Sequence, residues 1–358
     1  MIKNNFKIIF AGGGTGGHLY SGIAVADLIR KNYPEAKILF VGTPFGLEKE
    51  IVPECGYDLK FVEASPLKGS GVWFRIKSLL RLPKAYFQSK KILKDFQPDI
   101  VMGIGGYASG PMTLAAHFNK VFTAIIEQNS YPGFTNRKLG RFVDKIFIAF
   151  EKAREFFPKE KIVLSGNPVR SFLTPPNPKP EKPFTVLILG GSQGAHILNQ
   201  SMIEALPLLG EIKPELHFIH QTGKNDFSEV QEAYEKSGVS AEVFPFSQDL
   251  GPLYAKTHLA ICRAGAGTIA ELRLQGLPSI LVPYPYATDD HQRFNAQEMV
   301  DQGAAELCLN ADLNGKILAE RIRYYLKHTE ALPKMCEAAQ AQAKPLAAQE
   351  VLNQCLSR

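Results

Sequence analysis

A histidine closes the first glycine-rich segment of the chain, at a place where its side chain could take part in proton transfer. Residues 12–18 read GGGTGGH and directly follow the apolar run FKIIFA. A histidine at the mouth of a strand-to-helix turn can act as a general base near neutral pH. Gly16 and Gly17 would let a phosphate or a sugar approach the backbone at a helix N-terminus. We therefore predict that His18 is a catalytic base. The alternative is a tight turn that needs glycine only for packing.

The arrangement of an apolar run followed by a glycine-rich loop occurs a second time. Residues 190–196 read GGSQGAH after the apolar run FTVLIL, and the landmarks Gly12 and His18 have counterparts at Gly190 and His196. Neither segment ends in the GK[ST] of a phosphate-binding P-loop. The first could be taken for a loose dinucleotide motif, but the acidic residue expected about 20 positions later is not clearly placed. The repetition predicts two similar domains, each opening with a strand and a glycine turn.

Three further segments are rich in glycine or polar residues and could bind a ligand. The segment GIGGYASGP (103–111) is a third glycine loop after an apolar run. In RAGAGTIAE (263–271) small residues precede a helix, where the carboxylate of Glu271 could accept hydrogen bonds from ribose hydroxyls or be an ordinary solvated charge. The segment DDHQRFNA (289–296) places polar side chains after another apolar run and is only suggestive of ligand binding. The Ser192 hydroxyl, at a helix start, suits a diphosphate.

Composition limits the class of protein. The 358 residues are 45% hydrophobic and 21% charged, with a net charge of +6, as expected of a soluble globular protein with room for two domains. This modest charge suits an anionic small molecule or membrane surface as well as nucleic acid. The five cysteines form no CxxC pair, and no carboxylate or histidine cluster suggests a metal. With no signal peptide or spanning segment recognisable, we expect a cytosolic or membrane-surface protein.

Short apolar runs alternate with helical patterns, which predicts a doubly wound parallel α/β sheet. We expect a first domain over 1–166, a proline-rich linker over 167–183 and a second domain over 184–344. The last ~30 residues read as helix with a break at Pro345. Ligands of such sheets bind beyond the carboxyl ends of the strands. Two domains facing across a cleft could hold a donor on one wall and an acceptor on the other.

Residues 66–91 combine aromatic and basic side chains without any acidic residue. The only tryptophan, Trp73, stands beside Phe74 in the segment GVWF, which we interpret as an exposed turn. Aromatic residues favour the membrane interface, and basic residues are attracted by anionic lipid. The segment therefore predicts contact with a membrane surface, against the alternative of a core helix with a solvated basic face. The other residues that carry the prediction are Ile76, Leu79, Leu80, Leu82, Lys68, Arg75, Lys77, Arg81, Lys84, Lys90 and Lys91.

The motifs together resemble the MurG family of bacterial glycosyltransferases, nearly from end to end. They are GGTGGH, GIGGYASGP, EQN with PGFTNR, SGNPVR, GGSQGA, RAGAGTIAEL and GLPSILVPYPYATDDHQ. The resemblance implies the GT-B fold, with two Rossmann-like domains and a C-terminal helix, 345–358, that returns to the first domain. It also implies transfer of N-acetylglucosamine from UDP-N-acetylglucosamine to lipid I, which makes lipid II at the cytoplasmic face of the plasma membrane. No cofactor or nucleic acid is expected, and other cell-wall synthesis proteins are possible partners.

The resemblance also implies roles for single residues. Thr15, Gly16 and Gly17 would line the side of the donor sugar and diphosphate, Asn129 would contact the sugar, and Arg170 would reach the nucleotide. Ser192 would bind a phosphate, Glu271 the ribose and Gln292 the sugar hydroxyls. The remaining expected contacts are Ser247, Ala266, Gly267, Thr268, Ile269 and Ala270 on the nucleotide side, and Gly105, Gly106 and Tyr107 on the acceptor side.

Two positions depart from the family pattern. Ile126 stands where the family usually has the histidine of HEQN, which leaves His18 with fewer rivals as the base. Ser21 replaces a proline after the first motif, and we expect only a local change at the helix start. Rival functions are a UDP-sugar 2-epimerase or another lipid glycosyltransferase of the same fold, an NAD-dependent oxidoreductase, and a UDP-sugar-binding protein without turnover. Assays without a lipid acceptor or with NAD would separate these classes.

Overall fold

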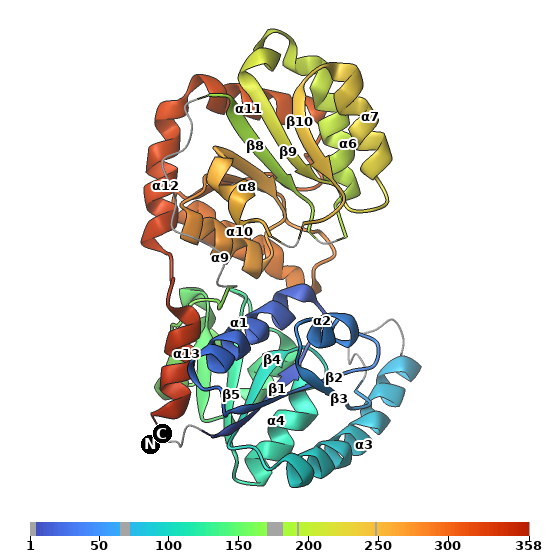
Figure 1. Ribbon diagram of the computed structural model, residues 1–358, viewed down its shortest axis with the longest axis vertical. Helices are drawn as coiled ribbons and strands as arrows, with labels where there is room; N and C mark the ends of the chain where they lie inside the picture. The colour runs from blue at the N-terminus through green and yellow to red at the C-terminus, as the bar shows by residue number, and fades with distance from the viewer. Residues whose placement is uncertain (1–4, 65–71, 170–181, 192, 248, 358) are drawn as a thin grey trace. The chain divides into compact units, whose positions relative to one another are not determined.

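The computed structural model describes residues 5–64, 72–169, 182–191, 193–247 and 249–357, with only the backbone for 72–81. Two compact units divide the chain (Figure 1). Unit 1 comprises Met1–Arg170 together with Leu346–Arg358, and unit 2 comprises Ser171–Pro345. The C-terminal segment thus belongs to the same unit as the N-terminus.

A parallel sheet forms the centre of unit 1, with strand order β3-β2-β1-β4-β5-β6-β7. Strands β1, β4 and β5 are short apolar runs that are almost entirely buried, as expected of strands covered on both faces. The edge strand β3 is mostly exposed. The bounds are β1 Lys7–Gly12, β2 Lys37–Gly42, β3 Asp58–Phe61, β4 Ile100–Gly105, β5 Phe122–Glu127, β6 Lys145–Ile148 and β7 Ile162–Val163.

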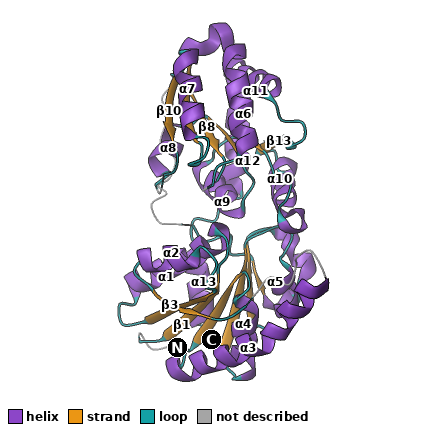
Figure 2. Ribbon diagram, turned by 90° about the vertical axis from the view of Figure 1, so that its right-hand side faces the viewer, coloured by secondary structure: helices purple, strands orange, loops and turns teal. Residues whose placement is uncertain are grey.

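The two faces of this sheet carry separate cores, because alternate residues of a strand point to opposite sides. Ile8 and Phe10 pack in a cluster that includes Ile23 of α1 and Leu352 of α13. Ile9 lies in the other cluster, with residues of α3 and α4. Helix α13 lies alongside α1 (Figures 1 and 2). The helices are α1 Gly16–Asn32, α2 Glu48–Glu54, α3 Val72–Phe96, α4 Ser109–Phe118, α5 Phe134–Leu139 and α13 Ala347–Leu356, with 3-10 turns η1 Glu151–Phe156 and η2 Lys159–Lys161.

Unit 2 repeats this design with the strand order β10-β9-β8-β11-β12-β13. Its largest core cluster joins Val186 and Phe218 of the sheet to Leu198 of α6, Tyr234 of α7 and Leu318 of α11. The strands are β8 Phe184–Leu189, β9 Leu216–Gln221, β10 Ser240–Phe244, β11 Leu259–Cys262, β12 Ser279–Leu281 and β13 Ala305–Leu307. The helices are α6 His196–Ala205, α7 Phe227–Ser237, α8 Gly251–Lys256, α9 Ala266–Gln275, α10 His291–Asp301, α11 Gly315–Lys327 and α12 Leu332–Ala341, with 3-10 segments η3 Leu206–Glu215, η4 Thr288–Asp290 and η5 Thr329–Ala331.

The first strand of each unit lies between two others in the same way. In unit 1 the chain goes outward from β1 to β2 and β3, then returns to the other side of β1 at β4. In unit 2, strands β8, β9, β10 and β11 repeat these moves. The strand order reverses between β1 and β4 and between β8 and β11. Such a switch point is where doubly wound sheets bind ligands.

The predicted membrane segment has a different local structure from the one expected. Helix α3 begins at Val72, so Trp73 and Phe74 lie in its first turn and not in an exposed turn before it. The side chains of residues 72–81, and Lys68, lie outside the described residues. Among the described residues, no helix is both long enough and apolar enough to cross a membrane.

Candidate functional site

The two glycine loops of unit 1 touch at the switch point between β1 and β4. The amide of Gly13 donates a 3.1 Å hydrogen bond to the carbonyl oxygen of Gly105. A Cβ atom at Gly106 would lie 2.3 Å from the carbonyl oxygen of Gly13, and one at Gly12 would lie 2.0 Å from that of Gly105. Real Cβ atoms do not approach an oxygen so closely, so these positions need glycine. Tyr107, next in the second loop, is 44% exposed.

His18 lies in the first turn of α1, beside both loops. Its Nδ1 is 3.2 Å from the hydroxyl oxygen of Thr15. Its ring lies so close to Gly105 that a Cβ atom there would be 2.9 Å from Cδ2. The ring is half-buried and therefore accessible to a ligand. The hydroxyl and the glycine fix the orientation of the imidazole, as a proton-transfer group requires.

The N-terminus of α1 has the features of an anion-binding position. Its N-cap residue, Thr15, makes no capping hydrogen bond with its side chain, and the first turn contains no acidic residue. Because the first amides of a helix lack intrahelical partners, they carry a partial positive charge. Gly16 and Gly17 place no side chain over these amides. The predicted binding residues Thr15, Gly16 and Gly17 therefore do lie beside His18.

The EQN motif begins at Glu127, the last residue of β5, one strand beyond β4. Burial raises the pKa of the Glu127 carboxyl, while hydrogen bonds from Asn129, Asn136 and Gly133 oppose that shift. The backbone amide of Asn129 donates to Glu127 over 2.9 Å and its side chain over 3.3 Å. Asn129 itself is only 9% exposed. Glu127, which our sequence analysis did not select, thus orders the loop that carries Asn129.

Ser21 has contacts beyond the start of its helix. Its hydroxyl donates to the carbonyl oxygen of His18 over 2.8 Å. It also accepts a 2.8 Å hydrogen bond from Nε2 of Gln128, which donates to the carbonyl oxygen of Ile104 as well. The expectation of a purely local effect at Ser21 is therefore too narrow. These bonds connect the turn of α1 that holds His18 to the ends of β4 and β5.

Gln221 connects two loops at the switch point of unit 2. Its Nε2 donates to the carbonyl oxygen of Gly191 over 3.0 Å. Its Oε1 accepts from the amide of Ser247, also over 3.0 Å. The loop is close-packed as well, because a Cβ atom at Gly194 would lie 2.1 Å from the carbonyl oxygen of Thr222. A buried glutamine that sequence reasoning missed thus holds Gly191 beside Ser247.

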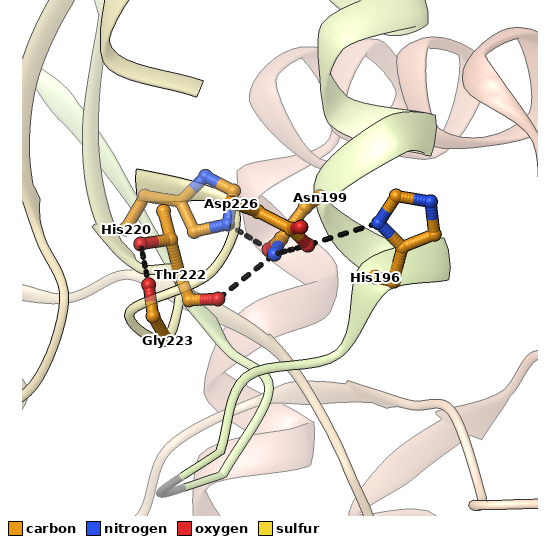
Figure 3. A network of polar contacts seen from close by, with 6 residues as sticks. All are labelled: His196, Asn199, His220, Thr222, Gly223 and Asp226. Carbon is orange, nitrogen blue, oxygen red and sulfur yellow. Dashed lines mark hydrogen bonds and ion pairs between the residues drawn. The ribbon is translucent and has the colours of Figure 1, made fainter. Parts of the chain in front are cut away.

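A polar network supports the helix that follows this loop (Figure 3). Asp226 accepts from Nδ2 of Asn199 over 2.7 Å and lies 3.0 Å from Nδ1 of His196. Oδ1 of Asn199 lies 3.0 Å from Nε2 of His220, whose Nδ1 is 3.2 Å from the Tyr234 hydroxyl. Because Oδ1 can only accept, Nε2 of His220 carries the proton and Nδ1 accepts from Tyr234. Burial lowers the pKa of His220 to about 3, so this ring stays neutral.

Glu271 lies in α9, about one turn beyond its start. Its Oε2 accepts a 2.8 Å hydrogen bond from the hydroxyl of Tyr254. Gly267, Thr268 and Ala270 are half-buried on the same helix, whereas Ala266 and Ile269 are buried. The side chain of Ile269 is 0% exposed and belongs to the core. Ile269 could therefore contact a ligand only through its backbone.

Gln292 and its neighbours follow β12, which ends at Leu281. Oε1 of Gln292 accepts a 2.9 Å hydrogen bond from the amide of Tyr284. Asp289 and Asp290 have φ angles of 56° and 53°. Left-handed conformations are strained for residues other than glycine and occur disproportionately at functional sites. The two aspartates thus form a tight junction between η4 and α10, and Gln292 lies in the first turn of α10.

Two predicted site residues, Arg170 and Ser192, lie outside the described residues. Within the part of the chain that the structure describes, no group of three or more histidine, cysteine, aspartate or glutamate side chains could hold a metal ion. The loops assembled at the two switch points can offer amides, hydroxyls and carboxylates to a ligand. Buried residues that we had not predicted hold these loops, namely Glu127 and Gln128 in unit 1 and Gln221 in unit 2.

Comparison with protein families gives two matches that divide the chain. Residues 8–148 match the glycosyltransferase family 28 N-terminal domain, and residues 185–351 match its C-terminal domain. A crystal structure of Acinetobacter baumannii MurG superposes with a TM-score of 0.81 at 29% identity, covering 99% of this chain and all of that one. Fold and site together define a glycosyltransferase with the GT-B fold.

Curated relatives show which group of glycosyltransferases the chain belongs to. A "UDP-N-acetylglucosamine--N-acetylmuramyl-(pentapeptide) pyrophosphoryl-undecaprenol N-acetylglucosamine transferase" of Myxococcus xanthus is 46% identical over 98% of this chain and 92% of its own length. A Syntrophus aciditrophicus protein of the same name is 43% identical over 98% of both chains. The chain therefore belongs to glycosyltransferase family 28 and, within it, to the MurG group. A Listeria monocytogenes structure described as a putative UDP-N-acetylglucosamine 2-epimerase shares the fold alone, with a TM-score of 0.69 at 16% identity.

Proposed function

We propose that this chain transfers N-acetylglucosamine from UDP-N-acetylglucosamine to the C4 hydroxyl of the muramoyl group of lipid I, making lipid II. The observation that carries this proposal is the 46% identity to the Myxococcus xanthus transferase over 98% of the chain. The loops at both switch points support it, because they join helix N-termini to a candidate base in unit 1 and to a carboxylate in unit 2. These are the groups that an anionic sugar nucleotide and a diphosphate acceptor require.

His18 acts as the general base in this proposal. The acceptor's C4 oxygen attacks the anomeric carbon, and its proton passes to the imidazole as the new bond forms. The bond from the anomeric carbon to the UDP oxygen breaks with inversion. The Thr15 hydroxyl, 3.2 Å from Nδ1, holds the ring in position for this step. Gly105, Gly106 and Tyr107 form the neighbouring acceptor side.

Unit 2 supplies the donor site in this proposal, over the predicted domain 184–344, while the predicted domain 1–166 takes the acceptor. Glu271 accepts hydrogen bonds from the ribose, and the amides of the 190–195 loop and of the first turn of α9 face the diphosphate. Such prearranged donors stabilise the charge that develops on the leaving UDP. Ser192, Ser247, Arg170 and Gln292 complete the donor contacts that the family resemblance implies.

We further propose that the protein works on the cytoplasmic surface of the plasma membrane, where its lipid acceptor is located. The basic and aromatic residues of segment 66–91 would contact the headgroups of anionic lipid. Sedimentation with anionic liposomes tests this with Trp73 and Phe74 changed to serine and Arg75 and Lys77 changed to glutamine. Reduced sedimentation with unchanged UDP binding is expected; unchanged sedimentation would place the surface elsewhere. Other cell-wall synthesis proteins would meet the enzyme there.

The decisive experiment measures transfer of labelled N-acetylglucosamine to a lipid I analogue. We expect a labelled disaccharide product that depends on both substrates. A parallel reaction without acceptor should give no 2-epimer of the donor sugar, which is the product of the rival epimerase class. Binding of UDP-N-acetylglucosamine without transfer would overturn the proposed activity in favour of a binding protein.

A further inference from the structure

We propose that Glu48 is a positioning residue for the catalytic loop of unit 1, which we define as residues 12–18. This inference rests on the proposed function, because it assumes that His18 takes part in glycosyl transfer. Glu48 is the first residue of α2, 30 positions after His18, and none of the motifs contains it. Its side chain is only 1% exposed. A buried carboxylate needs hydrogen-bond donors to offset its desolvation.

The donors come from two different loops. Oε2 of Glu48 accepts a 2.7 Å hydrogen bond from the amide of Gly14, in the catalytic loop. Oε1 accepts a 2.8 Å bond from the amide of Thr43 and a 2.9 Å bond from the Thr43 hydroxyl, just after β2. One carboxylate therefore joins the loop after β1 to the loop after β2. Hydrogen bonds to a charged group are stronger than those between neutral groups.

The side chain of Glu48 occupies a slot that three glycines create. A Cβ atom at Gly13 would lie 2.5 Å from Oε2, one at Gly42 would lie 2.4 Å from Cγ, and one at Gly46 would lie 2.0 Å from Oε2. These glycines come from the catalytic loop, the end of β2 and the turn before α2. Their lack of side chains lets the carboxylate reach Gly14. Gly13, Gly42 and Gly46 thus share one structural reason to be glycine, which is the space taken by the Glu48 side chain.

The hydrogen bond from Gly14 to Glu48 also determines which amides of the catalytic loop can face a ligand. The amide of Gly14 points to Glu48, so the anion-binding amides are those of the first turn of α1, beginning at Gly16. Gly14 itself has a φ angle of 84°, a conformation in which the chain reverses toward Thr15. Glu48 thereby fixes the approach of the chain to Thr15 and His18 without touching a substrate. A shift of about 1 Å in such a group can lower turnover about 100-fold.

The exchange Glu48→Gln tests this role with almost no change in shape. An amide nitrogen in place of one carboxylate oxygen must face either Gly14 N–H or Thr43 N–H, and two donors repel. We expect kcat to fall about 10- to 100-fold, while the KM for UDP-N-acetylglucosamine changes less than about twofold, since the proposed donor contacts of unit 2 remain. Glu50→Gln is the matched control, because Glu50 is exposed on the same helix.

Hydrogen exchange at the amides of residues 12–18 gives a readout that does not depend on activity. It should be faster in Glu48→Gln than in the wild type or in Glu50→Gln. Should Glu48→Gln fail to fold, Gly46→Ala provides a second variant, because its new Cβ displaces the carboxylate. Gly46→Ala should likewise lower kcat and speed exchange. Unchanged kcat and exchange in a folded variant would overturn the inference. Faster exchange in a protein that shows no transfer even as wild type would instead contradict only the proposed function.

Discussion

The hydroxyl of Tyr254 donates a 2.8 Å hydrogen bond to Oε2 of Glu271. Tyr254 lies in α8 and is 1% exposed, while Glu271 lies in α9 and is half-buried. The tyrosine ring is held by the core, so its hydroxyl has little freedom to move. One oxygen of the carboxylate is thereby oriented from within the protein. Glu271 is thus presented as an acceptor in a defined orientation.

Removal of the Tyr254 hydroxyl should weaken donor binding. In Tyr254→Phe the packing is retained but Glu271 loses its support, so we expect UDP affinity to fall roughly 2- to 10-fold, the equivalent of one ordinary hydrogen bond. Calorimetric titration with UDP measures this. On a Glu271→Ala background the same exchange should have little further effect. An equal loss on both backgrounds would mean that Tyr254 acts independently of Glu271.

Replacement of the candidate base should affect turnover and spare donor binding. We expect His18→Ala to lower kcat by about 100-fold or more, the usual scale for a positioned general base. Thr15→Val should have a smaller effect in the same direction, because it frees the ring that the hydroxyl holds. Steady-state kinetics with a lipid I analogue and calorimetry with UDP separate the two quantities. Nearly normal turnover in His18→Ala would reduce His18 to a structural residue of the turn.

Loss of the two hydrogen bonds made by Gln221 should weaken the binding of UDP. Gln221→Met keeps the length of the side chain but removes the bonds to Gly191 and Ser247. Each lost bond costs about 0.5–1.5 kcal/mol, so UDP affinity should fall roughly 10-fold. Gln231→Met, at an exposed position of α7, is the control and should bind UDP normally. Normal affinity in Gln221→Met would show that the 190–195 loop keeps its shape without the bridge.

His220 should make the protein sensitive to acid. Its pKa is about 3 in the folded protein and 6.5 in the reference state, so between these values only the unfolded chain binds the proton. The contribution of neutral His220 to the free energy of unfolding is fully present above about pH 6.5. It decreases as the pH falls toward 3. The contribution to the slope is about 1.4 kcal/mol per pH unit. Urea unfolding at several pH values should show a shallower dependence for His220→Gln.

Much of the arrangement could be predicted from local patterns. Apolar runs of strand length marked β1, β2, β4 and β5 because strands buried on both faces need continuous apolar sequence. Glycines at the ends of β1 and β8 marked the loops because only glycine tolerates their close backbone contacts. The interpretation of GVWF as an exposed turn was wrong, since tryptophan and phenylalanine after GSG fit a first helical turn as well as a loop. A single sequence offers little to decide between them.

The sequence by itself determined the fold class, the repeated strand-and-loop device, the candidate base His18 and the carboxylate Glu271. Each of these features depends on a few neighbouring residues, because turn geometry and the spacing of apolar residues are local properties of the sequence. Only the tertiary structure decided that Glu48 anchors Gly14, that Tyr254 orients Glu271 and that Gln221 joins Gly191 to Ser247. A hydrogen bond requires donor and acceptor within about 3 Å. Which side chains come that close depends on the strand order, which brings residues far apart in sequence to one edge of a sheet.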